Sequence, residues 1–374
     1  MNEREYNYWL SNINNIGPKK IEYLLDYYGS SEEVFKASES SIDEAINTSM
    51  KQGSVRFDKK DADNIRDNKN IDRIHMEYNI LLKKDIQFIT KLDQEYPQKL
   101  RPLYNGPFSL YIKGNLPDIS RKALAIVGTR NASAYGMEIT KYFSKSLATA
   151  GIGIISGLAR GIDTHAHKGA LEVSGITYGI LGCGIDICYP RENIQIYMEM
   201  QEKGAIISEY PPGVQPYASN FPMRNRIISG LSDGILVVEA KEKSGSLITV
   251  DMGLEQGKDI YAIPGRITDS LSFGCNNLIK MGARLVGSPH DILEELLTYY
   301  SNNHSINDNF PVTKNMTKEE ILIYESIDLE PTNIEEIAAI TSIPIPDLME
   351  LLLKLELSNM IKQPYKNFYM KSIL

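Results

Sequence analysis

Residues 123–130 read A-L-A-I-V-G-T-R, an apolar run of strand length that ends in a glycine and an arginine. Further apolar runs of this kind follow it, and segments with helical spacing separate them. The runs are Ala123–Val127, Ile152–Ile155, Ile176–Leu181, Ala205–Ser208, Ile235–Val238 and Ile260–Ile263. Near-continuous apolar strands that alternate with helices are typical of a parallel sheet buried on both faces. The sequence therefore predicts an α/β fold around a parallel sheet.

The segments that follow these strands have a composition that suits phosphate groups. Because parallel strands end at one edge of a sheet, these segments converge there, which is where such sheets bind ligands. Glycine lets backbone amides approach a phosphate, and hydroxyl and cationic side chains complete the site. The residues of this kind are Gly128 and Arg130 after the first strand, Ser156, Gly157, Arg160 and Gly161 after the second, and Lys241, Lys243, Ser244, Gly245 and Ser246 after the fifth.

The segment Phe221–Leu231, F-P-M-R-N-R-I-I-S-G-L, is the most informative part of this edge. Its spacing predicts the first turns of a helix, with Pro222 at the first helical position. Arg224, Asn225 and Arg226 then lie where the backbone N–H groups are unpaired and the helix dipole is positive. Two guanidinium groups do not stabilise that end of a helix, but they favour an anion there. Pairing of both arginines with carboxylates is the alternative interpretation.

The cations and the nearby aromatic residues favour a single-stranded nucleic acid as the ligand. Cations in a row suit successive phosphates, and the rings of Tyr135, Tyr210, Tyr217 and Phe221 lie in segments where they can stack on bases. Packing at the sheet edge is the competing interpretation for each ring. No strand is followed by G-x-G-x-x-G, and the chain has no G-x-x-x-x-G-K-[ST] motif. These absences argue against nicotinamide and nucleoside triphosphate cofactors.

Composition limits the class of protein. The 374 residues exceed the usual single domain, so we expect two or three. The net charge of −8 argues against a generally basic surface, so any site for a polyanion must be local. Cys183, Cys188 and Cys275 are few and odd in number, which indicates a reducing compartment without structural zinc. We expect no signal peptide, no membrane contact and a cytoplasmic location, because Met1–Leu10 is polar and no run approaches about 18 apolar residues.

Several of these motifs together resemble the DNA-processing protein A (DprA/Smf) family. The resemblance runs, in order, from about Tyr96 to Leu293. The matching segments are Ile126–Arg130 with Ala132–Gly136, Ser156–Asp163, Ser208–Gly213, Phe221–Leu231, Ser244–Thr249, Pro264–Gly265 and Gly274–Ile279. The resemblance implies an extended Rossmann-like domain that binds single-stranded DNA without catalysing a reaction and needs no cofactor or metal.

The resemblance also implies partners and site residues. It predicts a homodimer that loads the RecA recombinase onto incoming single strands during natural transformation and homologous recombination. The implied DNA contacts are Arg130, the loop Ser156–Gly161, Phe221, Arg224 and Arg226. The implied dimer surface lies near Gly274–Gly282, with Cys275, Leu278 and Ile279 as its candidate residues.

The sequence also divides the chain into domains. We expect residues 1–85 to form a helical domain and residues 86–295 to form the domain that, by the resemblance, binds single-stranded DNA. A break at Asn14–Lys20 resembles the turn of a helix-hairpin-helix (SAM-like) unit, and a plain helical bundle is the alternative. Residues 296–316 are rich in Asn, Ser and Thr and are predicted to be a linker.

Residues 317–374 resemble a winged helix, with helices at Glu320–Ile327, Ile334–Ile340 and Pro346–Leu357 and a β-wing at Met360–Met370. This unit holds five lysines and ten carboxylates, a net charge of −5. A winged helix that binds duplex DNA should present a basic face. We therefore predict that this unit contacts another protein.

Two other functions stay open at this point. Glu209 and Glu239 follow sheet strands, as catalytic carboxylates often do, which suggests a lysine-decarboxylase-like enzyme that hydrolyses nucleotides. The segment Ser244–Thr249 lacks the glutamate of that family's phosphate loop. A protein-binding scaffold is the third possibility.

Asp163, His165 and His167 form the pattern D-x-H-x-H, which could suggest a metal site. The two histidines point in different directions on a helix, so we expect no metal and predict that Asp163 caps the helix.

Overall fold

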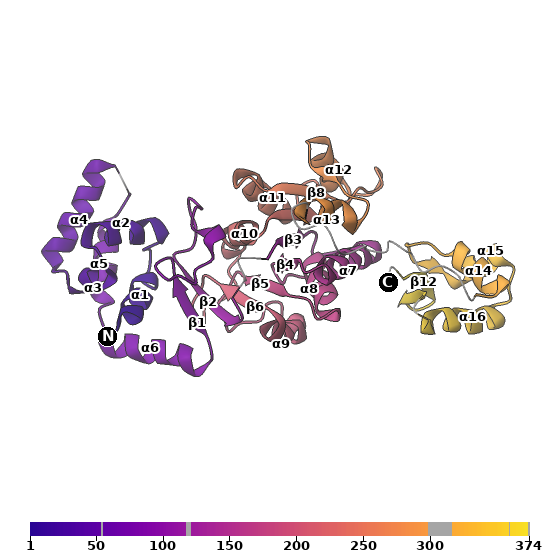
Figure 1. Ribbon diagram of the computed structural model, residues 1–374, viewed down its shortest axis with the longest axis horizontal. Helices are drawn as coiled ribbons and strands as arrows, with labels where there is room; N and C mark the ends of the chain where they lie inside the picture. The colour runs from indigo at the N-terminus through magenta and orange to yellow at the C-terminus, as the bar shows by residue number, and fades with distance from the viewer. Residues whose placement is uncertain (54, 117–120, 298–315, 359, 373–374) are drawn as a thin grey trace.

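The computed structural model describes residues 1–53, 55–116, 121–297, 316–358 and 360–372. Figure 1 shows three units in a row: an N-terminal helical unit, a central α/β unit and a C-terminal unit. Residues 298–315, most of the predicted linker, lie outside the described residues. Helix α13 (Pro289–Leu297) extends into the first two residues of that predicted linker.

The central sheet has the strand order β1-β2-β6-β5-β4-β3-β7-β8-β9 among the described residues. From β6 to β9 the neighbouring strands are parallel, which confirms the predicted α/β class. The predicted strands all form, each within a residue of its expected bounds. They are β3 (Ala123–Val127), β4 (Gly153–Ser156), β5 (Thr177–Leu181), β6 (Ala205–Ser208), β7 (Gly234–Val237) and β8 (Asp259–Ala262).

One end of the sheet departs from the expected parallel pattern. Strand β2 (Ser109–Gly114) pairs antiparallel with β6, and β1 (Gln87–Thr90) pairs antiparallel with β2. The sequence analysis did not predict β1, because four residues are too few to show a clear period. At the other end, β9 (Arg284–Leu285) is a short edge strand.

Helices cover both faces of the sheet, and β3 shows how the sequence achieves this. Leu124 and Ile126 point to one face, whereas Ala125 and Val127 point to the other, and all four are buried. Two apolar sides follow from the alternation of side chains along a strand. The first face packs against α7 (Ala134–Thr149), α8 (Ile162–Glu172) and α13, and the second against α10 (Asn220–Leu231), α11 (Gly245–Glu255) and α12 (Phe273–Lys280).

The N-terminal unit packs directly onto the central unit. Its helices in the described chain are α1 (Glu3–Ser11), α2 (Pro18–Tyr28), α3 (Ser31–Lys36), α4 (Glu39–Gln52), α5 (Lys59–Asp67) and α6 (Ile71–Lys83). A single hydrophobic cluster joins Trp9 and Leu24 to Phe88 and Tyr111 of the sheet. Pro18 begins α2, so the predicted break between α1 and α2 is confirmed. The helix-hairpin-helix interpretation of this turn stays a prediction.

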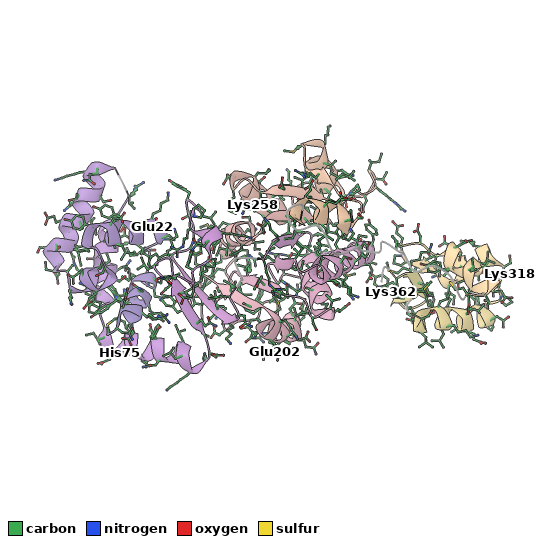
Figure 2. The ribbon with its side chains drawn as sticks, in the orientation of Figure 1. Glu22, His75, Glu202, Lys258, Lys318 and Lys362 are labelled. Carbon is green, nitrogen blue, oxygen red and sulfur yellow. The ribbon has the colours of Figure 1, made fainter. Side chains whose placement is uncertain are left out.

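The C-terminal unit contains the predicted helices and wing. They are α14 (Lys318–Ser326), α15 (Ile334–Thr341), α16 (Ile345–Leu357), β11 (Ile361–Tyr365) and β12 (Phe368–Lys371). A further short strand, β10 (Thr332–Asn333), pairs with β12. Lys362, labelled in Figure 2, donates to Glu138 of α7, and Arg266 lies 3.0 Å from Glu330. These ion pairs join the winged helix to the central unit.

A buried histidine lies between α8 and the sheet. The Thr177 hydroxyl donates to the Ile154 carbonyl at 2.9 Å, so it accepts the Nδ1–H of His167 at 2.7 Å. The Nε2 of His167 has no hydrogen-bond partner among the described residues. Burial, with a smaller effect of Arg224, lowers the pKa of His167 to about 3. The folded protein therefore holds this imidazole neutral.

We expect this histidine to make stability depend on pH. The unfolded chain binds a proton at His167 below about pH 6.5, whereas the folded chain does not until its lower pKa is reached. The contribution of this group to the free energy of unfolding is therefore fully present above about pH 6.5. It is lost as the pH falls toward the pKa of the folded state, by up to about 1.4 kcal/mol per pH unit. In the variant His167→Gln, the free energy of unfolding should fall less than in the wild type when the pH is lowered from about 7 to about 5. Urea unfolding at each pH measures this free energy. Parallel pH profiles would contradict the expectation.

Candidate nucleic-acid interface

The loops at the carboxyl ends of β3, β4 and β5 meet at one pocket. Helix α10, which follows β6, closes it. The residues that line the pocket are Arg130, Gly157, Ala159, Arg160, Tyr189, Pro190, Phe221 and Arg224. The sequence analysis named five of these as site residues, and the convergence of strand ends explains why they meet.

Arg224 lies beneath this pocket and is almost fully buried, with 4% of its surface exposed. Its Nη1 donates to the carbonyl of Gly157 at 2.7 Å and also to the carbonyl of Ile180. Its Nε donates to the Asn225 side chain at 3.2 Å. Burial lowers the pKa of Arg224 to about 10, and nearby Asp163 opposes that shift. Arg224 therefore stays charged at neutral pH and joins α10 to the ends of β4 and β5.

The loop after β4 is shaped by close packing around this guanidinium group. A Cβ on Gly157 would lie 2.6 Å from the Arg224 nitrogens, and Gly161 has a φ of +73°. Ser156 is buried and donates to the Ile126 carbonyl at 2.7 Å, which holds the loop to β3. Gly128, at the end of β3, packs against Ile162 of α8. These small residues allow the loops to approach one another, so several of them support the pocket from below.

Asp163 does not cap α8, so that prediction is wrong. Gly161 is the N-cap residue, and the Asp163 carboxylate instead accepts the backbone N–H groups of Gly157 and Ala159 at 3.1 and 3.3 Å. Asp163 thus stabilises the loop that precedes the helix.

The accessible part of the pocket combines cations with aromatic rings. The ring centroid of Phe221 lies 5.5 Å from the Arg130 guanidinium carbon and 6.0 Å from that of Arg224. Tyr189 is 46% exposed, and its ring centroid lies 5.8 Å from that of Phe221 at an interplanar angle of 32°. Arg130 and Arg160 are exposed, and the Nη2 of Arg160 donates to Glu192 at 3.1 Å. Exposed cations beside two neighbouring rings suit a phosphate and a base.

The sequence analysis missed Tyr189 as a stacking candidate. A signal was present, because Tyr189 and Pro190 follow β5 at the same sheet edge. Of the rings it did name, Tyr217 is exposed, whereas Tyr135 and Tyr210 are partly buried. Burial raises the pKa of Tyr210 to about 12. None of these three residues lines the pocket around Phe221.

Arg226 lies outside this pocket despite its place on the same helix turn. Its Nη2 donates to Glu209 at 2.5 Å, and its side chain is buried. Its Nε and Nη1 have no hydrogen-bond partners among the described residues. For Arg226, this is the carboxylate pairing that the sequence analysis gave as the alternative for both arginines, whereas Arg224 donates to carbonyl and amide oxygens.

The basic segment before α11 also lies apart from the pocket lining. Lys241, Lys243 and Gly245 are exposed, and Ser244 caps α11 by accepting the N–H of Ser246. The Ser244 and Ser246 hydroxyls lie 2.8 Å apart. This segment follows β7, on the far side of β3 from the pocket, so any contact with a ligand there would extend the site along the sheet edge.

The candidate dimer residues on α12 differ in accessibility. Cys275 is fully buried, and its Sγ contacts the Val237 carbonyl at 3.7 Å. Leu278 and Ile279 are partly buried against the core, whereas Phe273 and Met281 on either side of them are exposed. Cys275 therefore belongs to the interior of the chain.

The two carboxylates of the enzymatic alternative both have structural partners. Glu209 pairs with Arg226, and Glu239 accepts the N–H and hydroxyl of Ser133 at 2.9 and 2.5 Å, where α7 begins. In the part of the chain that the structure describes, no three His, Cys, Asp or Glu residues form a group that could hold a metal. No helix within those same residues has the length and apolar character needed to cross a membrane.

The chain is similar to known proteins over most of its length. The family described as DNA recombination-mediator protein A matches residues 87–297, and the DprA winged helix domain matches residues 311–364. DNA processing protein DprA of Bacillus subtilis is 42% identical over 215 residues, which cover 57% of this chain and 72% of that protein.

Two solved structures share the fold. A crystal structure of DNA processing protein A from Streptococcus pneumoniae has a TM-score of 0.65 at 32% identity, covering 81% of this chain and all of the other. A Helicobacter pylori DNA processing protein A, whose structure is described for its single-stranded DNA binding mode, has a TM-score of 0.52 at 29% identity. That match covers 57% of this chain and 98% of the other.

The buried position of Arg224 leads to a prediction about stability. We expect Arg224→Met to lower the free energy of unfolding by about 2–4 kcal/mol, because the carbonyls of Gly157 and Ile180 lose a charged donor and Asp163 loses its cation. Urea unfolding measures the loss. The exposed Arg130 provides the matched control, since Arg130→Met should change stability by no more than about 0.5 kcal/mol. Equal stabilities for both variants would contradict the buried role.

Proposed function

The chain belongs to the DNA recombination-mediator protein A (DprA/Smf) family, and from this premise we propose that it binds single-stranded DNA at the pocket around Phe221. The observation that carries the proposal is the Phe221 ring, which lies beside the exposed Arg130 guanidinium and the exposed Tyr189 ring. Single-strand binding proteins combine cations that follow the phosphates with aromatic rings that stack on bases. The single-stranded DNA binding mode described for the Helicobacter pylori relative supports the same ligand.

Within this site the residues take different roles. We assign direct DNA contact to Arg130, Arg160, Tyr189 and Phe221, because their side chains line the pocket and are wholly or partly accessible. Arg224 attracts phosphate from beneath the pocket and holds its loops in place. The basic segment Lys241–Ser246 extends the path for a longer strand.

We propose a binding function without catalysis. The carboxylates that an enzyme would use are Glu209 and Glu239. Glu209 forms an ion pair with Arg226, and Glu239 accepts hydrogen bonds at the N-terminus of α7. Burial raises the pKa of Glu239, but both of its oxygens accept hydrogen bonds from Ser133. The scaffold alternative would leave the basic and aromatic pocket without a ligand.

The partners that we propose are those that the family resemblance implies. We propose that the protein acts in the cytoplasm as a homodimer, protects incoming single strands and loads the RecA recombinase onto them. The net charge of −5 on the winged helix supports contact with a protein, because such a surface repels DNA phosphates.

DNA binding can be tested with a variant that leaves the fold intact. Arg130→Ala should weaken binding to oligo-dT by about 10-fold or more, because a charge-assisted phosphate contact and a cation next to Phe221 are lost. The log–log salt slope should become shallower by about one. Filter binding at several salt concentrations measures both quantities.

Lys203→Ala is the matched control for this measurement. Lys203 is exposed and precedes β6, so it lies at the opposite edge of the sheet from the pocket. Equal loss of affinity in both variants would show that general charge, and not the pocket, binds the DNA.

The dimer can be tested on α12 in a similar way. Met281 is 79% exposed at the end of this helix, and a carboxylate there would be desolvated in a dimer. We expect Met281→Glu to shift sedimentation from dimer to monomer, whereas Met198→Glu on α9 (Ile194–Lys203) should leave the dimer unchanged. A wild-type protein that sediments as a monomer at micromolar concentration would contradict the proposed dimer.

A further inference from the structure

Helix α16 of the winged helix carries a stripe of large apolar side chains that its own unit does not bury. Ile345, Met349, Leu353 and Leu357 recur every four residues and are 43%, 55%, 55% and 76% exposed. Residues at this spacing lie in a row along one side of a helix. We refer to these four residues as the α16 stripe.

The fold of the unit does not require this stripe. Leu348, Leu352 and Leu355 of the same helix are buried, and they form the core together with Ile323 and Ile337. The apolar side of α16 is therefore wider than its core contact. A contiguous exposed apolar row on a folded unit is a common sign of an interaction site.

The stripe also lies away from the central unit. The ion pairs that join the two units come from Lys362 of β11 and from Glu330, which precedes β10. Figure 1 shows β12 on the side of the unit that faces α7 and α16 along the lower border of the unit, and the stripe residues stay exposed in the whole chain. The central unit therefore leaves the stripe accessible.

Duplex DNA does not suit this helix. In helix-turn-helix folds the second helix of the motif enters the major groove and carries side chains that bind bases and phosphates. Here that helix is α16, which has three carboxylates and one lysine, and the lysine, Lys354, lies 2.8 Å from Glu350. Its net charge of −2 repels the phosphate backbone.

A second copy of the chain is also a poor match. Pairing two α16 stripes would bring Asp347, Glu350 and Glu356 of one copy close to those of the other. Like charges at an interface disfavour association. The acidic border instead complements a partner that carries positive charge beside an apolar surface.

We propose that the α16 stripe binds an amphipathic helix of another protein, one with an apolar side flanked by lysine or arginine. This rests on the protein-binding role proposed above for the winged helix. From Ile345 to Leu357 the stripe spans about 18 Å, which matches roughly three turns of a partner helix. Rows spaced by four residues form the ridges that interlock when two helices cross at about −50°. Such a groove-bound helix is a common mode of peptide recognition.

A peptide pair tests the proposal on the full-length protein. The first probe is a synthetic peptide of about 18 residues with leucines on one helical side and lysines beside them, and the second has glutamate in place of each lysine. In fluorescence anisotropy the lysine peptide should bind at least about 10-fold more tightly than the glutamate peptide. The double variant Met349→Glu/Leu353→Glu should lose at least about 10-fold of that affinity.

Control variants establish that the loss of peptide binding is specific to α16. Met76→Glu on α6, equally exposed in the N-terminal unit, should bind the lysine peptide as the wild type does. Binding to oligo-dT should be unchanged in the double variant, so a failure of peptide binding and a failure of DNA binding can be told apart. Thermal unfolding confirms that the winged helix stays folded, and Met349→Gln/Leu353→Gln replaces the double variant if it does not.

Three results would overturn the proposal. The first is equal affinity of the wild type for both peptides, and the second is undiminished binding of the lysine peptide by a folded double variant. The third is evidence that the stripe binds another ligand. In that case the wild type would not bind the lysine peptide, and the double variant would lose self-association or duplex DNA binding.

Discussion

The buried guanidinium group of Arg224 is the interaction on which the candidate site depends. It joins three parts of the chain that are distant in sequence, because it extends from α10 to the carbonyls of Gly157 and Ile180. A charged donor below the surface forms stronger hydrogen bonds than a neutral one and would be costly to leave unpaired. The pocket above it therefore has a firmly held base, and the buried cation lies beneath the exposed cations Arg130 and Arg160.

The same constraint explains the surrounding residue types. Gly157 must lack a side chain because Arg224 occupies that space, and Gly161 takes a left-handed φ where the loop turns into α8. Asp163 offsets the buried charge and accepts amides of the loop. Residues that look like phosphate ligands in the sequence can thus act by positioning the residues that line the pocket. The proposed DNA contacts come from the accessible residues of the pocket, which are Arg130, Arg160, Tyr189 and Phe221.

The three units of the chain differ in how they are joined. The N-terminal helices share a hydrophobic cluster with the sheet, so the two form a continuous interior. The winged helix has its own hydrophobic core and meets the central unit through the ion pairs of Lys362 and Arg266. A unit that is acidic, separately packed and apolar on α16 is suited to contact a partner while the central unit binds its proposed DNA ligand. This arrangement is the basis of the proposed division of roles.

The sequence by itself determined the α/β class, the predicted strands and the winged helix, because hydrophobic period and glycine placement are local properties. It also indicated the sheet edge at which the candidate pocket lies, since that follows from strand direction. Only the tertiary structure decided which arginines are accessible: Arg130 is exposed, Arg224 is buried beneath the pocket and Arg226 pairs with Glu209. The three have the same chemistry in the sequence, and their difference arises from neighbours that are far apart along the chain.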